Sequence, residues 1–172
     1  GPGILDSSEF VRDFDRNMDD VAVGRHIGSM GGCIHLLRCR QITIDGPVLR
    51  DPHIWCLAAF GCTEVAIAHV KEIGLWRYNA DGIDICNCQN VTVKHCFVRS
   101  FDDSLVVKGM RYCTELPNKN ILFEDCVVWN DWGRSLEIGA ETSAPEFSNV
   151  TFRDCDVVRA TFSALDVQHG DR

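Results

Sequence analysis

The sequence predicts an all-β fold, a right-handed parallel β-helix in which one chain winds into a solenoid. Two observations predict it: a four-residue segment that recurs five times, and a second set of short strands with alternating apolar residues. The first apolar residues of the recurring segments stand at positions 42, 65, 91, 121 and 150, so the copies are 23, 26, 30 and 29 residues apart. This is the spacing of a solenoid whose loops vary in length.

The recurring segments predict one strand in each coil: Gln41–Ile44, Glu64–Ile67, Asn90–Val93, Asn120–Phe123 and Asn149–Phe152. Six of the ten cysteines keep a fixed place beside them, three residues before the first apolar residue or five residues after it. They are Cys39, Cys62, Cys88, Cys96, Cys126 and Cys155. Residues at equal repeat positions stack, and a free Cys behaves as a small hydrophobe. We therefore expect two columns of buried free thiols.

A second strand is expected in the later coils, at Gly82–Ile85, Ser104–Val107, Ser135–Ile138 and Ala164–Val167. Alternation directs one set of side chains inward: Ile83 and Ile85, Leu105 and Val107, Leu136 and Ile138, Leu165 and Val167. The intervening residues Asp84, Val106, Glu137 and Asp166 are expected to face solvent. An immunoglobulin-like sandwich is the alternative fold, but it predicts no constant register of side chains between strands.

The chain is expected to form a single domain over residues 1–172, with a less regular part at 1–33. Ile4–Asp6 is expected to be the strand of an earlier coil, and 13–20 a loop or short helix. The expected strand at 164–167 is followed by no polar capping element. This predicts a run of coils from a longer protein, or ends covered by another chain through end-to-end self-association.

Composition limits the classes of ligand that the chain is expected to bind. The formal net charge is −8 with a pI near 5.1, and the cations are scattered along the chain, which disfavours nucleic acid and anionic membranes as partners. A neutral or weakly charged ligand fits better. The cysteine spacing gives no pair of C-x-x-C motifs, and the dispersed histidines are expected to be structural, so we expect neither a metal site nor a cofactor.

Chemistry is expected where the coils align. Asp81, Asp103 and Arg134 each stand two residues before the first inward residue of a second-set strand, so they form one column, with Asp102 beside it. Neighbouring coils lie about 4.8 Å apart. Carboxylates this close raise the pKa of at least one of them, and an acid beside carboxylate bases suits glycoside hydrolysis. Adjacent aspartates also occur in turns, but the alignment with Asp81 favours a functional site.

These residues also resemble a known family. Residues 79–84, N-A-D-G-I-D, resemble the N-T-D-G-I-D motif of glycoside hydrolase family 28, the polygalacturonases. Residues 102–108, D-D-S-L-V-V-K, resemble its D-D-C-x-x-x-K motif, and 132–139 are similar to its third motif, G-H-G before an apolar strand and Gly. The resemblance implies a secreted or periplasmic inverting hydrolase in which Asp102 donates the proton while Asp81 and Asp103 activate water.

Two departures from the family pattern concern the substrate. Arg134 replaces the histidine of the third motif, and this permanent cation is expected to lower the pKa of a neighbouring carboxyl and so oppose the acid role of Asp102. The basic R-I-K motif is replaced by Asp166, Val167 and Gln168. Polygalacturonate carries a carboxylate on every ring, whereas related β-helix hydrolases of neutral glucans lack the basic pair. We therefore expect a neutral poly- or oligosaccharide substrate.

Seven residues around the aspartates are expected to bind it: Asn79, Lys108, Trp132, Arg134, Glu137, Asp166 and Gln168. Trp132 is the one tryptophan expected to stack on a sugar ring, because it directly precedes the aligned column. Two other functions stay open. A non-catalytic carbohydrate-binding or structural β-helix would not require the three aspartates, and a polysaccharide lyase would require calcium and a base at the centre of the cleft.

Overall fold

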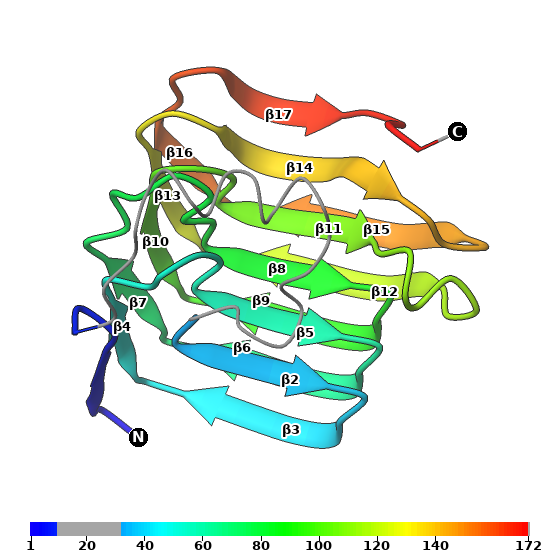
Figure 1. Ribbon diagram of the computed structural model, residues 1–172, viewed down its shortest axis with the longest axis horizontal. Coiled ribbons are helices and arrows are strands. Elements are labelled where there is room, and N and C mark those ends of the chain that lie inside the picture. The colour runs from blue at the N-terminus through cyan, green and yellow to red at the C-terminus, as the bar shows by residue number, and fades with distance from the viewer. Residues whose placement is uncertain (10–31, 172) are drawn as a thin grey trace.

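The computed structural model describes residues 1–9 and 32–171, and their strands form three parallel sheets. Figure 1 shows the coils stacked from β2 and β3 at the bottom to β17 at the top. This confirms the predicted right-handed parallel β-helix. The expectation for residues 13–20, and most of the less regular part at 1–33, lies outside the described residues. Among the described residues, no helix has the length and apolar character needed to cross a membrane.

The repeat sheet holds the five recurring segments. Its strands are β3 (Arg40–Asp45), β6 (Thr63–Ala68), β9 (Gln89–Lys94), β12 (Asn118–Glu124) and β15 (Phe147–Arg153). The first apolar residues of consecutive copies are register partners, from Ile42 through Val65, Val91 and Ile121 to Val150. The predicted strands and their register are confirmed.

The first residue of every copy turns the chain into the repeat sheet with a positive φ. The φ angles are 57° at Gln41, 58° at Glu64, 56° at Asn90, 56° at Asn120 and 50° at Asn149. Asparagine enters this left-handed region more readily than most residues. The constant position of the copies therefore reflects a constant corner of the coil.

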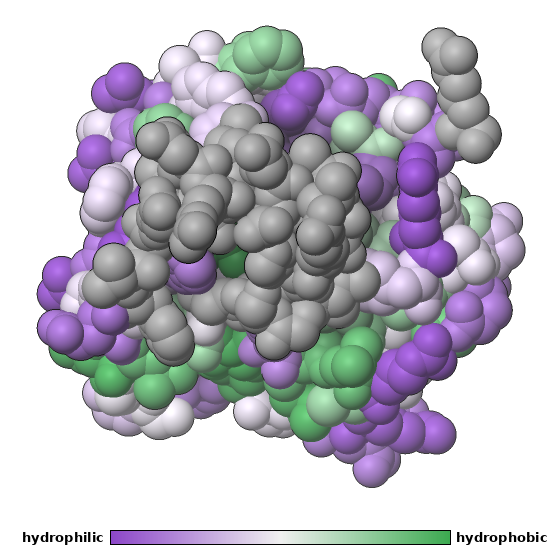
Figure 2. Space-filling view, in the orientation of Figure 1, coloured by the Kyte–Doolittle hydropathy of each residue, from purple (hydrophilic) through white to green (hydrophobic). Residues whose placement is uncertain are grey.

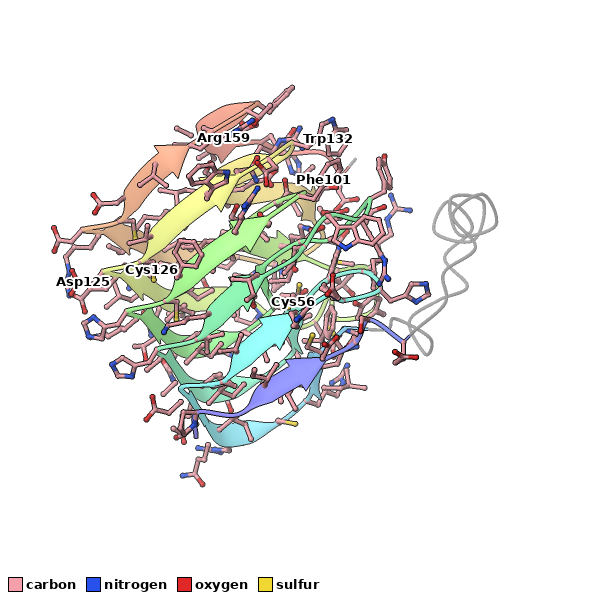
Figure 3. The ribbon with its side chains drawn as sticks, turned by 90° about the vertical axis from the view of Figure 1, so that its left-hand side faces the viewer. Cys56, Phe101, Asp125, Cys126, Trp132 and Arg159 are labelled. Carbon is pink, nitrogen blue, oxygen red and sulfur yellow. The ribbon has the colours of Figure 1, made fainter. Side chains whose placement is uncertain are left out.

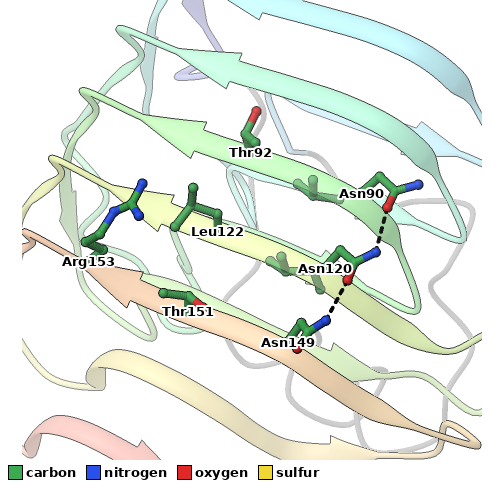
Figure 4. Close-up of a pocket in the computed structure, with 9 residues that line it drawn as sticks. Asn90, Thr92, Asn120, Leu122, Asn149, Thr151 and Arg153 are labelled. Carbon is green, nitrogen blue, oxygen red and sulfur yellow. Dashed lines mark hydrogen bonds between the residues drawn. The ribbon is translucent and has the colours of Figure 1, made fainter.

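The three asparagines at these corners form a ladder on the outside of the solenoid (Figure 4). Asn120 Nδ2 donates to Asn90 Oδ1 at 2.9 Å, and Asn149 Nδ2 donates to Asn120 Oδ1 at 2.9 Å. The ladder lines an open groove of about 450 Å³ on the outer face of the repeat sheet. This groove lies on a different sheet from the aspartates.

The aspartate sheet contains the second predicted set of strands. Its members are β2 (Ile34–Leu37), β5 (Leu57–Phe60), β8 (Ile83–Cys86), β11 (Leu105–Gly109), β14 (Arg134–Thr142) and β17 (Ser163–Val167). Ile83 pairs with Leu105, Leu105 with Leu136, and Leu136 with Leu165. The predicted register is therefore confirmed. At β17, the outermost strand, Leu165 and Val167 are exposed although they belong to the predicted inward set.

The expectation that the alternate residues of this sheet face solvent is wrong for three of four. Asp84, Val106 and Glu137 are fully buried, whereas Asp166 on the outermost strand is partly exposed. The outer face carries a second apolar cluster made by Ile54, Trp55, Ala58, Phe60 and Cys86, with Met110 and Tyr112 packed against it. Alternation identifies the two faces of a strand, but it does not show that residues beyond the strand cover the outer face.

A third sheet, which the sequence did not predict, closes each coil. Its strands are β1 (Ile4–Asp6), β4 (Val48–Arg50), β7 (Lys71–Ile73), β10 (Phe97–Ser100), β13 (Val127–Asn130) and β16 (Asp156–Arg159). β1 confirms the strand predicted at Ile4–Asp6. Strands this short show little alternation, and at an inward position between Leu49 and Val98 the chain places the fully buried Glu72.

The solenoid interior is filled by stacked apolar side chains and thiols. All ten cysteines are free, which confirms the predicted thiol columns. In one column, the Cys39 amide lies 3.3 Å from Cys62 Sγ, and the Cys62 amide 3.2 Å from Cys88 Sγ. Cys39 and Cys155, at the ends of the columns, are partly exposed. Figure 2 shows patches of apolar surface in the lower left and lower centre of the view, toward the end of the solenoid where β2 and β3 lie in Figure 1.

Candidate active site

The predicted column forms at the entrance to the aspartate sheet, where three successive coils turn into β8, β11 and β14. The Gly82 amide donates to Asp103 O at 2.8 Å, and the Ser104 amide donates to Arg134 O at 2.8 Å. These bonds place Asp81, Asp103 and Arg134 on neighbouring coils at equal positions. Asp81, Asp102 and Asp103 are 1%, 7% and 7% exposed, respectively. The structure therefore brings together the residues that the sequence aligned.

A buried ammonium group joins three of the carboxylates. Lys108 Nζ lies 2.7 Å from Asp81 Oδ2, 3.0 Å from Asp84 Oδ1 and 3.5 Å from Asp103 Oδ2. The same atom lies 4.1 Å from the centre of the Trp55 ring, within the range of a cation–π interaction. The structure thus surrounds Lys108, which was expected to bind substrate, with protein groups.

Burial and the neighbouring charges shift the pKa values of this ion-pair cluster in opposite directions. Burial raises the pKa of Asp81 well above its ordinary value, and the ammonium of Lys108 offsets part of this effect. The pKa of Asp84 rises to about 7, again because of burial and against the attraction of Lys108. Burial lowers the pKa of Lys108, but Asp81 and Asp84 outweigh it and hold that pKa well above the ordinary value. Lys108 therefore remains charged at neutral pH.

Two hydrogen bonds fix the backbone of Asp102, and the pKa of its side chain is raised. Its carbonyl oxygen accepts hydrogen bonds from Ser100 Oγ and Asn130 Nδ2, each at 2.7 Å. Gly133 packs so closely that a Cβ there would lie 2.6 Å from Asp102 Oδ1. Burial first, and then the charge of Asp103, raises the pKa of Asp102 to about 6. The side chain can therefore carry a proton in weakly acidic solution.

Asn130 is a buried residue of this region that the sequence did not indicate. Besides the Asp102 carbonyl, its Nδ2 lies within hydrogen-bond distance of Ser104 Oγ (3.1 Å) and Arg134 O (3.2 Å). It thereby links the turns of two coils. Asn130 ends the short strand β13 of the third sheet, and no motif marks it in the sequence.

Arg134 engages the residues that stand in place of the family's basic motif. Its Nε lies 3.1 Å from Asp166 Oδ2 and 3.6 Å from Glu137 Oε1, and its Nη1 lies 3.9 Å from Asp103 Oδ1. Gln168 Nε2 donates to Glu137 Oε1 at 2.8 Å. Four of the expected substrate-binding residues are thus brought into one network beside Asp103.

Aromatic side chains border the site on the side of Asp102. The rings of Phe101 and Trp132 stack with their centres 5.6 Å apart. Figure 3 labels both residues in the upper part of the view. The ring of Tyr78 is tilted against that of Trp132, with ring centres 5.3 Å apart. Trp132 is 45% exposed. Asn79 follows Tyr78 in the turn before Asp81, with φ 55°, and its side-chain oxygen has no hydrogen-bond partner among the described residues.

The histidines expected to be structural include a stacked pair at the corner between the repeat sheet and the third sheet. The rings of His69 and His95 lie 5.3 Å apart, and each ring approaches an aspartate, at Asp45 and Asp125. Both residues have φ near 54°. Their position on the outside of the corner separates them from the aspartate column.

Comparison with known proteins adds a family and a fold. The family model of "Glycosyl hydrolases family 28" matches residues 31–164. Among solved structures, a hyperthermoactive exopolygalacturonase from Thermotoga maritima superposes with a TM-score of 0.69 at 21% sequence identity, over 86% of this chain and 37% of that chain. The chain thus spans just over a third of the length of that enzyme. A comparison with curated proteins gives no match.

Proposed function

The chain belongs to glycosyl hydrolases family 28, and from this we propose that it hydrolyses glycosidic bonds of a poly- or oligosaccharide with Asp81, Asp102 and Asp103. The observation that carries the proposal is the environment of Asp102. Its carboxyl is nearly buried beside Asp103, and its pKa is raised to about 6. A protonated carboxyl next to ionisable carboxylates is the pairing that glycoside hydrolysis uses.

The proposed roles follow from this pairing. Asp102 donates its proton to the leaving glycosidic oxygen while Asp81 and Asp103 activate a water molecule on the opposite face of the sugar. Direct attack by water inverts the anomeric configuration. Lys108 and Glu137 lie in the buried part of the site, so in this proposal they orient the catalytic carboxylates. The more exposed Trp132, Arg134, Asp166 and Gln168, together with Asn79, contact the substrate.

The proposed substrate is a neutral glycan. Six carboxyl groups lie at the site, from Asp81, Asp84, Asp102, Asp103, Glu137 and Asp166, and two cations accompany them. Lys108 is enclosed by carboxylates, and Arg134 is engaged by Asp166. A uronate would meet excess negative charge without a free bidentate partner. A secreted or periplasmic location belongs to the same proposal, since polysaccharide substrates lie outside the cell.

The test is a hydrolysis screen over neutral and acidic polysaccharides, with three forms of the protein. The wild type should release reducing ends from at least one neutral glycan. Asp102→Asn should release none above background, and Asp154→Asn, a matched change at an exposed corner, should behave as the wild type. Proton NMR of the first product should show the inverted anomer. Equal activity of wild type and Asp102→Asn would refute the proposal.

A further inference from the structure

Glu137 is a buried carboxyl on the outer face of the aspartate sheet. Its register places it between Val106 on β11 and Asp166 on β17, and its side chain is fully buried. Its Oε1 accepts the hydrogen bond from Gln168. Among the described residues, no N–H or hydroxyl group donates to its Oε2. Oε2 is therefore the atom on which an acidic proton can reside.

Glu137 also shares a side-chain hydrogen bond with Asp103. Two ionised carboxylates only accept hydrogen bonds, so one member of this pair must carry a proton. Burial, then the bond to Asp103 and the negative charge of Asp103, raise the pKa of Glu137 to about 8. Asp103 already accepts from the Arg134 amide and faces the Lys108 ammonium group, whereas no donor reaches Glu137 Oε2 among the described residues, so the proton of the pair belongs on Glu137.

The other contacts of Asp103 show how the hydrogen bond from Glu137 affects the orientation of the Asp103 carboxylate. The Arg134 amide donates to Asp103 Oδ1 at 3.1 Å, and Lys108 Nζ lies 3.5 Å from Asp103 Oδ2. An ionised carboxylate offers about four acceptor positions. The amide, the ammonium group and the Glu137 acid together take three of them. One position remains for a water molecule.

We propose that Glu137 is a positioning residue that keeps its proton at neutral pH and donates it to Asp103, so that the Asp103 carboxylate stays in the orientation that binds the attacking water. The role of that water rests on the proposed function. The proton on Glu137 does not, because the buried carboxyl pair requires it whatever the substrate is. The two statements can therefore be tested separately.

The charged groups around Glu137 determine its response to pH. Asp103 and Lys108 face it from the coil of β11, Arg134 faces it from its own strand, and Asp166 approaches from β17 through Arg134. While Glu137 is neutral, its carbonyl and acid groups add no charge beside Asp103 and Asp166, which face Arg134 and, for Asp103, the Lys108 that Asp81 and Asp84 also share. When it ionises, a third carboxylate is added, and its bond to Asp103 becomes a repulsion. Asp103 then loses its fixed orientation.

The first experiment compares pH profiles of kcat/KM on the substrate identified by the screen. Asp102 must be protonated, so wild-type activity should fall tenfold per pH unit above about 6, and a hundredfold per unit above about 8 as Glu137 also ionises. Glu137→Gln keeps a donor for Asp103 and cannot ionise. It should retain kcat within about threefold at pH 6 and keep the tenfold slope above pH 8.

Glu137→Leu removes the donor and should lower kcat at pH 6 by on the order of tenfold or more. A purely structural role predicts that Glu137→Gln and Glu137→Leu lose activity alike. That result, or a wild-type slope that does not steepen above pH 8, would overturn the positioning role.

The second experiment needs no substrate. Folded Glu137 keeps its proton up to pH about 8, whereas an unfolded glutamate loses its proton near pH 4.5, so folding becomes less favourable across that range. Glu137→Gln should therefore melt at a higher temperature than the wild type, by a margin that grows from pH 5 to pH 8 and then levels. The exposed control Glu146→Gln should show no such growth.

The same margin should shrink when both proteins also carry Asp103→Asn, because the neighbouring negative charge is then gone. A margin that is flat with pH, or unchanged by Asp103→Asn, would overturn the protonated pair even if the protein hydrolyses glycans. A growing margin without detectable hydrolysis would uphold the pair and count against the proposed function alone.

Discussion

Arg134 Nε lies 3.1 Å from Asp166 Oδ2, so the cation that replaces the family's histidine points to the carboxylate that replaces the first residue of its basic motif. The two departures form one ion pair. Arg134 was expected to lower the pKa of Asp102 and so oppose its role as an acid, but the carboxylate nearest to Arg134 is that of Asp166. Among the causes that set the pKa of Asp102 near 6, burial and Asp103 outweigh the attraction of Lys108 and Arg134.

The ion pair predicts how substrate charge is selected. Asp166→Asn keeps the side chain's shape but releases the charge of Arg134, so kcat/KM for polygalacturonate should rise about tenfold relative to a neutral glycan. That ratio corresponds to about 1.4 kcal/mol, within the range of a charge-assisted hydrogen bond. The measurement compares both substrates at one pH and low salt. Asp156→Asn, at an exposed position of β16, is the control, and wild-type enzyme that prefers polygalacturonate would contradict the assignment.

Removal of the proposed acid gives the second prediction. Asp102→Asn should lower turnover by on the order of a thousandfold or more, because an amide cannot protonate the leaving group. In the wild type, kcat/KM should decline as pH rises through about 6, where the carboxyl loses its proton. Asp81→Asn and Asp103→Asn should also abolish turnover. Circular dichroism should show a native fold for each of the three variants. If one of them keeps near-parental activity, the aspartate that it lacks has no part in the mechanism.

The sequence predicted two of the three sheets and the aspartate column because both depend on residues at constant repeat positions. Register partners such as Val65 and Val91 follow from a count along the chain. The third sheet escaped prediction because its strands are short and Glu72 breaks the apolar pattern.

The side chains that surround the aspartates were not predicted from the sequence, for a different reason. Lys108 reaches across coils to Asp81, and Asn130 reaches them from the third sheet. Such contacts depend on how side chains cross between coils, and repeat spacing carries no information about that. Repeat position placed Asp84 and Glu137 on the outer face of the sheet, but it did not reveal the side chains that pack against them there, such as Lys108 beside Asp84 and Gln168 beside Glu137.

Lys108 provides a prediction about stability. Lys108→Met leaves Asp81 and Asp84 buried without their cation, and loss of one member of a buried ion pair typically costs about 3–5 kcal/mol. The loss should be smaller at pH 5 than at pH 8, because Asp84, with a pKa of about 7, is protonated at pH 5. Urea unfolding at the two pH values measures this. The exposed Lys71→Met is the control, and an equal loss at both pH values would contradict the ion-pair account.

Asn130 provides the last prediction, which separates stability from catalysis. Asn130→Ala removes one of the two donors to each of the carbonyl groups of Asp102 and Arg134, which keep only Ser100 Oγ and the Ser104 amide, respectively. The free energy of unfolding should fall by about 2 kcal/mol. Because the turn that carries Asp102 is then less well fixed, kcat should also fall, by on the order of tenfold, under conditions where the protein remains folded.

The matched control for this prediction is Asn120→Ala in the outer ladder. It breaks two side-chain hydrogen bonds and places alanine at φ 56°, so it should cost about 1–2 kcal/mol of stability. It lies on the repeat sheet, away from the aspartates, and should leave kcat unchanged. If both variants lose stability but keep kcat, Asn130 supports only the fold. If Asn120→Ala also loses activity, kcat responds to stability in general, and the link between Asn130 and Asp102 fails.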